Sequence, residues 1–313
     1  MLLAFALSFF SASAHAAPGL RWQLLSNDAC DVRAFGAVGD NRTDDTAAIQ
    51  RAIDRCHSDH PERAVVLITQ GTYRISSSIA FCSNTTILLG LNTTLFSSFS
   101  PADKTRQNPR CPTLYWSRGP TGVLCGTNLT NVALIGAHEN SSVVDGGGWP
   151  WYAAGLANKS LWGQGPRLFE VAWSSNVTLS RVALVNSPSW TVHPTFCRGV
   201  LAEHIRISNP RFTPNTDGFD PDSSVDVVLR DSVIDTGDDA ISIKSANSTE
   251  PGARHVQMPA RNIHIYRVKL LSRNFCVGSA TFGGVYDVLV EDCEIGDDEG
   301  SAPWAIKYKS HQQ

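Results

Sequence analysis

At 313 residues, the chain can bury a large core, and nothing in it requires a second domain. Its apolar fraction of 42% and charged fraction of 18% are ordinary for a soluble globular protein. The net charge of -3 and the lack of any Lys/Arg block argue against nucleic acid as a partner. A polyanionic ligand would have to be held by a few local cations instead.

The first sixteen residues are typical of an export signal. The apolar run from Leu2 to Phe10 is too short to span a bilayer, and Ala14-His15-Ala16 fits a cleavage site. No Lys or Arg precedes the run, so an apolar N-terminal strand is the alternative interpretation. We expect residues 1–16 to be a signal peptide and residues 17–313 to form one domain. No later stretch predicts a membrane helix.

Two further features favour a secreted, extracellular protein. The eight cysteines are even in number and lack metal-type spacing, which indicates disulfides. Cys30 with Cys56 and Cys111 with Cys125 are the expected pairs, although spacing alone does not fix connectivity. Acceptor sequences for N-glycosylation are also frequent. They lie at Asn41, Asn84, Asn92, Asn128, Asn140, Asn158, Asn176 and Asn247.

The first predicted element is a helix that begins near Thr43 or Asp44, either of which can serve as its N-cap. Its apolar residues recur at helical spacing, at Ile49, Ala52, Ile53 and Cys56. This helix precedes the strands described next. We expect it to cover the apolar N-terminal end of their stack, with a place along its side as the alternative.

From about residue 130 the chain contains short segments in which Val, Ile or Leu alternates with polar residues, the pattern of strands. NVALIGA at Asn131 is the first of these segments. Later segments start at Asn176, Gly199, Asp226, Asn262 and Asp287, at spacings of 23, 27, 36 and 25 residues. Second short strands follow turns, as in AISIKS at 240–245 and WAIKYKS at 304–310.

Repeats of this length favour a solenoid, because a single coil cannot bury its apolar face alone. A leucine-rich repeat would need a fixed Leu/Asn frame, and propeller blades would run to about 40 residues or more. A βα sandwich would need amphipathic helices between the strands, and none is predicted after residue 60. The sequence therefore predicts an all-β, right-handed parallel β-helix with a short N-terminal capping helix.

The segment from 214 to 247 contains the residues that indicate chemistry. Asp217 lies in an Asn-Thr-Asp-Gly turn, and Asp238-Asp239 lies in a Gly-Asp-Asp turn 21 residues later, close to one coil. The two turns should stack about 5 Å apart and bring three carboxylates to one groove. Glycoside hydrolysis needs one protonated and one ionised carboxyl, and inverting enzymes hold them about 6.5–9.5 Å apart. A calcium site, as in a pectate lyase, is the other interpretation of clustered aspartates. The further aspartates Asp220, Asp222, Asp297 and Asp298 are expected to be ordinary solvated turn residues.

Several stretches, matched in order and spacing, resemble the glycoside hydrolase family of polygalacturonases and rhamnogalacturonan hydrolases. They are DVRAFGAVGDNRTDDTAAIQ at 31–50, RLFEVAWSSNVTL at 167–179, NSPSWTVHP at 186–194, NTDG at 215–218, GDDAISIKS at 237–245, VGSATFGG at 277–284 and AIKYKS at 305–310. The resemblance implies Asp238 as general acid and Asp217 with Asp239 as the groups that activate water. It aligns the family's substrate-binding strand lysine with Lys307.

Two departures concern substrate binding. Where endo-polygalacturonases have Gly-His-Gly, this chain has Ser272-Arg273-Asn274, and Ala305 takes the place of the arginine in Arg-Ile-Lys. Arginine recognises carboxylates in a bidentate manner, so its loss removes an anchor for galacturonate. Arg273 can supply a cation nearby, or it is a surface residue. His193 can project into the groove one coil before Asp217, or it is a structural histidine.

We expect a secreted enzyme that cleaves α-1,4-galacturonosyl or related pectic bonds with inversion, without metal or cofactor. A pectic polysaccharide is the expected partner of a monomer, with no nucleic acid or membrane. A rhamnogalacturonan hydrolase, which resembles this chain in lacking both the His and the Arg, is one alternative. A non-catalytic pectin-binding β-helix is another, since the chain stops directly after the Lys307 strand. We expect it to lack the C-terminal coils of its relatives.

Overall fold

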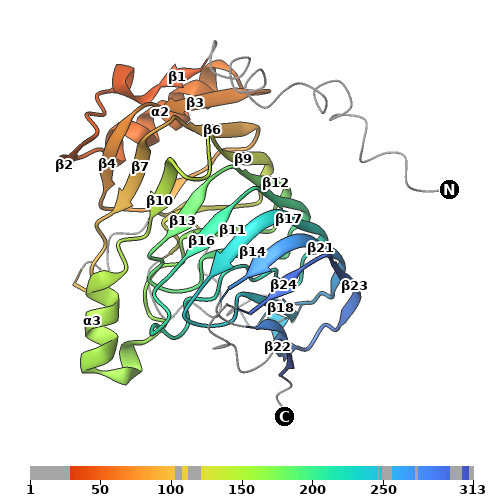
Figure 1. Ribbon diagram of the computed structural model, residues 1–313. Coiled ribbons are helices and arrows are strands. Elements are labelled where there is room, and N and C mark those ends of the chain that lie inside the picture. The colour runs from red at the N-terminus through yellow and green to blue at the C-terminus, as the bar shows by residue number, and fades with distance from the viewer. Residues whose placement is uncertain are drawn as a thin grey trace.

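The computed structural model describes residues 29–102, 108–111, 121–245, 247–248, 256–271, 274–296 and 305–309. The expected signal peptide, Arg273, Asp297 and Asp298 lie outside these ranges. The described chain winds into a solenoid whose coils follow one another from the N-terminal end to the C-terminal end (Figure 1). The predicted all-β parallel β-helix is confirmed.

Three stacks of parallel strands form the faces of the solenoid. The first stack contains β1 (Cys30–Asp31), β3 (Ala64–Ile68), β6 (Thr85–Leu89), β9 (Thr130–Gly136), β12 (Ser175–Ser180), β15 (Arg198–Glu203), β17 (Val225–Asp235), β21 (Ala260–Leu270) and β23 (Val285–Glu291). The second contains β2 (Asp40–Asp44), β4 (Gly71–Ile75), β7 (Thr93–Ser97), β10 (Ser142–Asp145), β13 (Ala183–Val185), β16 (Arg206–Ser208), the later parts of β17 and β21, and β24 (Glu294–Ile295).

The third stack presents the candidate site. It contains β5 (Ile79–Ala80), β8 (Leu124–Thr127), β11 (Phe169–Ala172), β14 (Val192–Thr195), β18 (Ile241–Ser245), β22 (Phe275–Thr281) and β25 (Ile306–Tyr308). Between β14 and β18 the stack is continued by bridges through Phe219 and Asp222. A short antiparallel pair, β19 (Asn247–Ser248) with β20 (Val256–Gln257), lies outside the three stacks.

The core consists of inward side chains stacked from coil to coil. Val177, Val200, Val227 and Ile263 occupy equivalent positions in successive strands of the first stack, and all are buried. Alternate residues of each strand face the core, because successive side chains in a strand point to opposite faces. Each coil thus buries its apolar face against its neighbours, as the alternating sequence pattern predicts.

The coils begin earlier than predicted. β3, β4, β6 and β7 already form stacked pairs well before residue 130. The repeat is hard to see there because β6 and β9, which are hydrogen-bonded neighbours, start 45 residues apart at Thr85 and Thr130. A long connection between neighbouring strands hides the period from a search by spacing.

The predicted helix is α2 (Thr46–Asp59), preceded by a short 3-10 turn, η1 (Val32–Phe35). Its buried residues join the core at the N-terminal end, which confirms the capping role. They are Ala48, Ile49, Ala52, Ile53 and Cys56. The predicted N-cap is wrong, because Asp45 holds that position. Its carboxylate instead accepts hydrogen bonds from Val38 N and Gly39 N, at 2.7 and 3.0 Å.

A second helix, α3 (Trp149–Ala157), is present that the sequence analysis did not predict. It is followed by the 3-10 turn η2 (Lys159–Leu161) and lies along the side of the solenoid (Figure 1). The Tyr152 hydroxyl donates to Ser187 O at 2.7 Å, and Trp151 Nε1 donates to Phe99 O at 3.2 Å. The helix was not predicted because its sequence, WPWYAAGLA, has no amphipathic period.

One corner of the solenoid repeats a left-handed backbone conformation, which asparagine tolerates better than most residues. The residues that adopt it are Asn84, Asn131, Asn176, Gly199, Asp226, Asn262 and Asp287. Asn131 Nδ2 donates to Asn84 Oδ1 at 2.7 Å, and Asn176 Nδ2 donates to Asn131 Oδ1 at 3.0 Å. The side chains therefore form a ladder that ties successive coils together.

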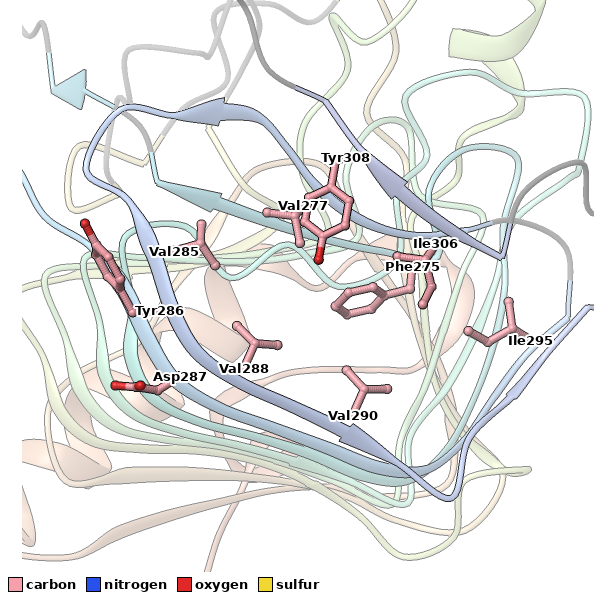
Figure 2. A pocket seen from close by; sticks show the side chains of 10 residues that line it. All are labelled: Phe275, Val277, Val285, Tyr286, Asp287, Val288, Val290, Ile295, Ile306 and Tyr308. Atoms are coloured by element: carbon pink, nitrogen blue, oxygen red, sulfur yellow. The ribbon is translucent and has the colours of Figure 1, made fainter.

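A cavity of about 310 Å³ lies at the C-terminal end of the described coils, between the last described strands, and its walls are mostly apolar (Figure 2). Phe275 of β22, Val288 and Val290 of β23, and Ile306 of β25 line it. These residues continue the stacks of the core in the last described coil, and the lining of the cavity includes none of the candidate catalytic carboxylates.

We predict that Asn131→Ala lowers the melting temperature more than Asn131→Gly does. Both substitutions remove the ladder hydrogen bonds, but only alanine must adopt the left-handed conformation with a Cβ, at a cost of about 1–2 kcal/mol. Glycine loses part of this advantage through its greater freedom in the unfolded chain. Thermal unfolding followed by circular dichroism measures both variants. Equal stability of the two would contradict a conformational role for this corner.

Candidate active site

The two aspartate turns lie on neighbouring coils, as predicted. Gly218 N donates to Asp239 O at 3.0 Å, and the bridge between Phe219 and Ile241 continues the pairing. On the preceding coil, Thr191 N donates to Asp217 O at 2.8 Å. Backbone hydrogen bonds between coils therefore fix the turns that carry Asp217 and Asp239, one above the other.

Asp217 is a buried acid among other acids. Its Oδ2 lies 3.4 Å from Lys244 Nζ, and its Oδ1 is buried without a hydrogen-bond partner among the described residues. Burial raises the pKa of Asp217 well above its usual value, and the negative charges of Asp220, Asp238 and Asp239 add to this effect. The ammonium of Lys244 opposes it. The charge on Asp217 is thus decided by competing neighbours.

Asp239 is also buried, and its partners differ from those of Asp217. Its Oδ2 forms an ion pair with Lys309 Nζ, and its Oδ1 accepts a hydrogen bond from Asn274 Nδ2 at 3.2 Å. The pKa of Lys309 is lowered by burial but raised more by its hydrogen bond and charge interaction with Asp239, so the net shift is upward. A cation and an amide donor therefore hold Asp239 in place.

Asp238 is half-buried and is held by backbone groups. Its Oδ2 accepts from Asn215 N at 2.8 Å, and its Oδ1 accepts from Asp239 N at 2.9 Å. The ion pairs of this cluster that involve described residues reach Asp217, Asp220 and Asp239, but not Asp238. The three predicted catalytic carboxylates are thus brought together with unequal surroundings.

Lys244 completes the cluster. It follows the Asp238-Asp239 turn on β18 and is buried, with its Nζ 2.7 Å from Asp220 Oδ2. The ammonium also lies 4.4 Å from the centre of the Trp190 ring. Burial lowers the pKa of Lys244, but Asp220 and Asp217 raise it more, so the ammonium stays charged. Asp220, interpreted from sequence as a solvated turn residue, is instead fully buried, because Lys244 neutralises it.

Asp222 and His193 belong to a second buried network beside the first. His193 is fully buried, with Nδ1 3.6 Å from Glu170 Oε1 and Nε2 3.8 Å from Asp222 Oδ2. Arg167 Nη1 pairs with Glu170 Oε1 at 2.8 Å and its guanidinium lies 4.7 Å from the Trp190 ring. Of the two alternatives for His193, its burial favours the structural histidine over projection into the groove. The expectation that Asp222 is solvated is wrong, because Asp222 is fully buried beside His193.

In the C-terminal segment where Lys307 was predicted to bind substrate, the lysine that contacts a candidate catalytic aspartate is Lys309, two residues further on. Lys307 is half-buried and pairs in register with Cys276, whereas Lys309 contacts Asp239. Arg273 lies outside the described residues, so its predicted proximity to the groove remains a prediction. Its neighbour Asn274 is buried against Asp239.

Sequence reasoning missed Lys244, Lys309, Asn274 and Trp190. The spacing of Lys244 could have indicated its place. It pairs with Asp222, which lies 22 residues earlier, and Ile241 pairs with Phe219 across the same interval of 22 residues. A charged residue in an otherwise apolar strand, placed one coil after an acid-rich turn, indicates a buried ion pair. No comparable spacing is available for Lys309, since the segment before β25 is irregular in length.

Both disulfides expected from the sequence are present, between Cys30 and Cys56 and between Cys111 and Cys125. Among the described residues, no three His, Cys, Asp or Glu side chains are grouped so that they could hold a metal ion. The described helices include none of the length and apolar character needed to cross a bilayer.

Comparisons with known proteins agree with the geometry. The model of the family "Glycosyl hydrolases family 28" matches residues 90–308, and that of "Rhamnogalacturonase A/epimerase, pectate lyase-like" matches residues 29–93. A protein from Vitis vinifera named "Probable polygalacturonase" is 32% identical over 82% of this chain and 53% of its own length. A polygalacturonase of Ralstonia nicotianae is 30% identical over 86% of this chain and 57% of its own length.

Solved structures with the same fold include the polygalacturonase of Erwinia carotovora, with a TM-score of 0.72 and 25% identity. The match covers 90% of this chain and 72% of that one. The family 28 exopolygalacturonase of Yersinia enterocolitica also has a TM-score of 0.72, at 20% identity, over 90% of this chain and 55% of that one. This chain spans about half the length of the curated relatives it matches. With the family model matched over more than two thirds of its residues, the chain belongs to glycosyl hydrolases family 28.

Proposed function

We propose that this protein hydrolyses α-1,4-galacturonosyl or related bonds of pectic polysaccharides with inversion of configuration. The observation that carries the proposal is that three adjacent carboxyls have different partners. Asp217 and Asp239 each have a lysine, Lys244 or Lys309, within ion-pair distance, whereas backbone N–H groups hold Asp238. Inverting glycosidases need such a division between a carboxyl that gives a proton and carboxylates that accept one.

In the proposed reaction, Asp238 donates its proton to the glycosidic oxygen as the bond to the anomeric carbon breaks. A water molecule, deprotonated by Asp217 and Asp239, attacks that carbon from the opposite face. The half-buried Asp238 is the most accessible of the three acids, which suits contact with a leaving group. The buried Asp217 Oδ1 accepts no hydrogen bond from the described residues, and it can therefore accept one from the water.

Pectic chains are polyanions, so the substrate must be met by local cations. Aligning the family's Arg-Ile-Lys with Lys307-Tyr308-Lys309, rather than with Ala305-Ile306-Lys307, keeps a cation at both charged positions. The contact between Lys309 and Asp239 supports that register. The names of the relatives support galacturonan as substrate, while the match of residues 29–93 to a rhamnogalacturonase model keeps rhamnogalacturonan as the second candidate.

We also propose that the protein is secreted. Two disulfides are favoured in an oxidising compartment. Among the acceptor asparagines, six are exposed, which suits glycosylation: Asn41, Asn92, Asn128, Asn140, Asn158 and Asn176. In the ladder, Asn176 donates through Nδ2, the atom to which a glycan would be attached, whereas Asn84 accepts through Oδ1.

Asp238→Asn is expected to reduce kcat by about 10²–10⁴-fold, because the leaving oxygen loses its proton donor. Release of reducing ends from polygalacturonate and from rhamnogalacturonan measures the effect. Asp226→Asn is the matched control, since Asp226 is a solvent-side aspartate of the corner ladder. Undiminished turnover by Asp238→Asn would sink the assignment, and pectin binding without turnover by the parent would favour a non-catalytic protein. Calcium-dependent release of unsaturated products would indicate a lyase.

Lys309→Met and Lys307→Met separate the two alignments of the strand. We expect Lys309→Met to lower kcat at least tenfold, roughly the value of one lost charge-assisted contact, because it removes the partner of Asp239. Lys307→Met should act mainly on KM. Steady-state kinetics on oligogalacturonides provide both constants. A larger loss of kcat in Lys307→Met would restore the alignment that places the family lysine at Lys307.

Because Asp217 is held among like charges, we expect its ionised form to lower the free energy of unfolding. The folded protein raises the pKa of Asp217, so its proton is bound more tightly than in the unfolded chain. Stability from this group is therefore lost as pH rises through the raised pKa. Asp217→Asn should raise the melting temperature by roughly 1–3 °C at pH 7 and by less at pH 4.

Asp231→Asn is the control of opposite sign. Arg267 donates to both oxygens of Asp231, at 2.6 and 2.9 Å, and this lowers the pKa of Asp231. Stability from Asp231 is therefore present above its unfolded pKa and lost as pH falls. The substitution should lower the melting temperature at pH 7. If Asp217→Asn and Asp231→Asn were destabilised equally at pH 7, the prediction that ionised Asp217 lowers the stability of the folded protein would be disproved.

A further inference from the structure

Lys244 has no step in the proposed reaction, yet it occupies the centre of the carboxyl cluster. Its ammonium lies 3.4 Å from Asp217 Oδ2 and 2.7 Å from Asp220 Oδ2. Its side chain is 8% exposed, so it has little access to a substrate in the groove. A buried lysine with two acids and no role in substrate contact acts on the protein's own groups.

The groups around Asp217 make this cation necessary. Asp220, Asp238 and Asp239 are all negative neighbours, and each opposes ionisation of Asp217. Among the described residues, Lys244 is the cation that forms an ion pair with Asp217. A carboxyl so placed would retain its proton without a nearby positive charge, and a protonated acid cannot accept a proton from water.

The position of the ammonium is itself controlled. Asp220 is fully buried on the coil between Trp190 and Lys244, and it holds the ammonium closer than Asp217 does. The ring of Trp190, 4.4 Å away, packs against the charge and favours it through its electron-rich face. Asp220 therefore anchors Lys244 and competes with Asp217 for it.

The other charged groups near Lys244 are largely paired among themselves. Asp222 adds a favourable charge interaction with Lys244 and lies 3.8 Å from His193. His193 in turn faces Glu170, which pairs with Arg167. Arg167 lies against the same Trp190 ring as Lys244, but its ion pair is with Glu170. Asp239 has its own cation in Lys309, and Asp238 accepts hydrogen bonds from backbone N–H groups.

We propose that Lys244 is a positioning residue that favours the ionised form of Asp217, which acts as the base. We also propose that Asp220, by binding the same ammonium, limits how strongly Lys244 stabilises the charge on Asp217. This inference rests on the proposed role of Asp217 in activating water. It predicts that removing the charge of Lys244 raises the pH at which Asp217 ionises, whereas removing the charge of Asp220 does not, although both side chains are buried in the same cluster.

The test is the pH dependence of kcat/KM for Lys244→Met and Asp220→Asn. The acidic limb of this profile reports ionisation of the base in the free enzyme. Loss of the cation should move the limb of Lys244→Met about 1–3 pH units upward. Loss of the competing anion should leave the limb of Asp220→Asn at or below its original position. Arg167→Met removes another buried cation from the same tryptophan, and its limb should stay in place.

A second readout does not need turnover. Titration of the Asp217 carboxyl by ¹³C NMR, assigned by its absence in Asp217→Asn, should show ionisation at higher pH in Lys244→Met. An unshifted carboxyl in folded Lys244→Met, or upward shifts in both Lys244→Met and Asp220→Asn, would overturn the inference. If the parent hydrolyses no pectic substrate, the proposed function fails, and the NMR titration still decides whether Lys244 controls the charge of Asp217.

Discussion

The backbone pairing between successive coils is the constraint on which the site depends. Gly218 N donates to Asp239 O, and Thr191 N donates to Asp217 O, so three turns are held in register at one corner. The parallel stack that buries Val177, Val200 and Val227 thereby also superimposes acidic turns. A slip of one residue in this stack would turn inward side chains outward, so the core protects the geometry of the site.

The same stacking creates an electrostatic problem. Asp217, Asp220, Asp238 and Asp239 converge on adjacent coils, and burial makes their mutual repulsion more costly. Lys244 and Lys309 offset this repulsion at two of the acids that the proposed mechanism requires as anions. Asp238 receives backbone N–H groups instead. The lysines therefore give chemically identical side chains different surroundings, on which the proposed division of roles rests.

The sequence was sufficient for the fold class and for the stacking of the turns that contain the three candidate carboxyls, because both depend on local patterns. Alternation in segments such as DVVLRDS predicts strands, and the spacing of Asp217 and Asp238 predicts stacked turns. It was insufficient for Lys309, since a two-residue ambiguity between Lys307 and Lys309 can be resolved only by strand register. The burial of Asp220 was misjudged, and the choice between the two alternatives for His193 stayed open, for a related reason. Whether a polar side chain in a β-helix is exposed depends on what the neighbouring coils place beside it, and local sequence does not record that.

The stereochemistry of the first product tests the central claim most directly. Proton NMR during cleavage of a defined α-1,4-linked oligogalacturonide distinguishes the anomers before they interconvert. A single displacement by water, with Asp238 as acid and Asp217 with Asp239 as base, predicts a β-configured reducing end at the outset. An initial α-configured reducing end would show retention, and it would contradict the division of roles among these three carboxyls.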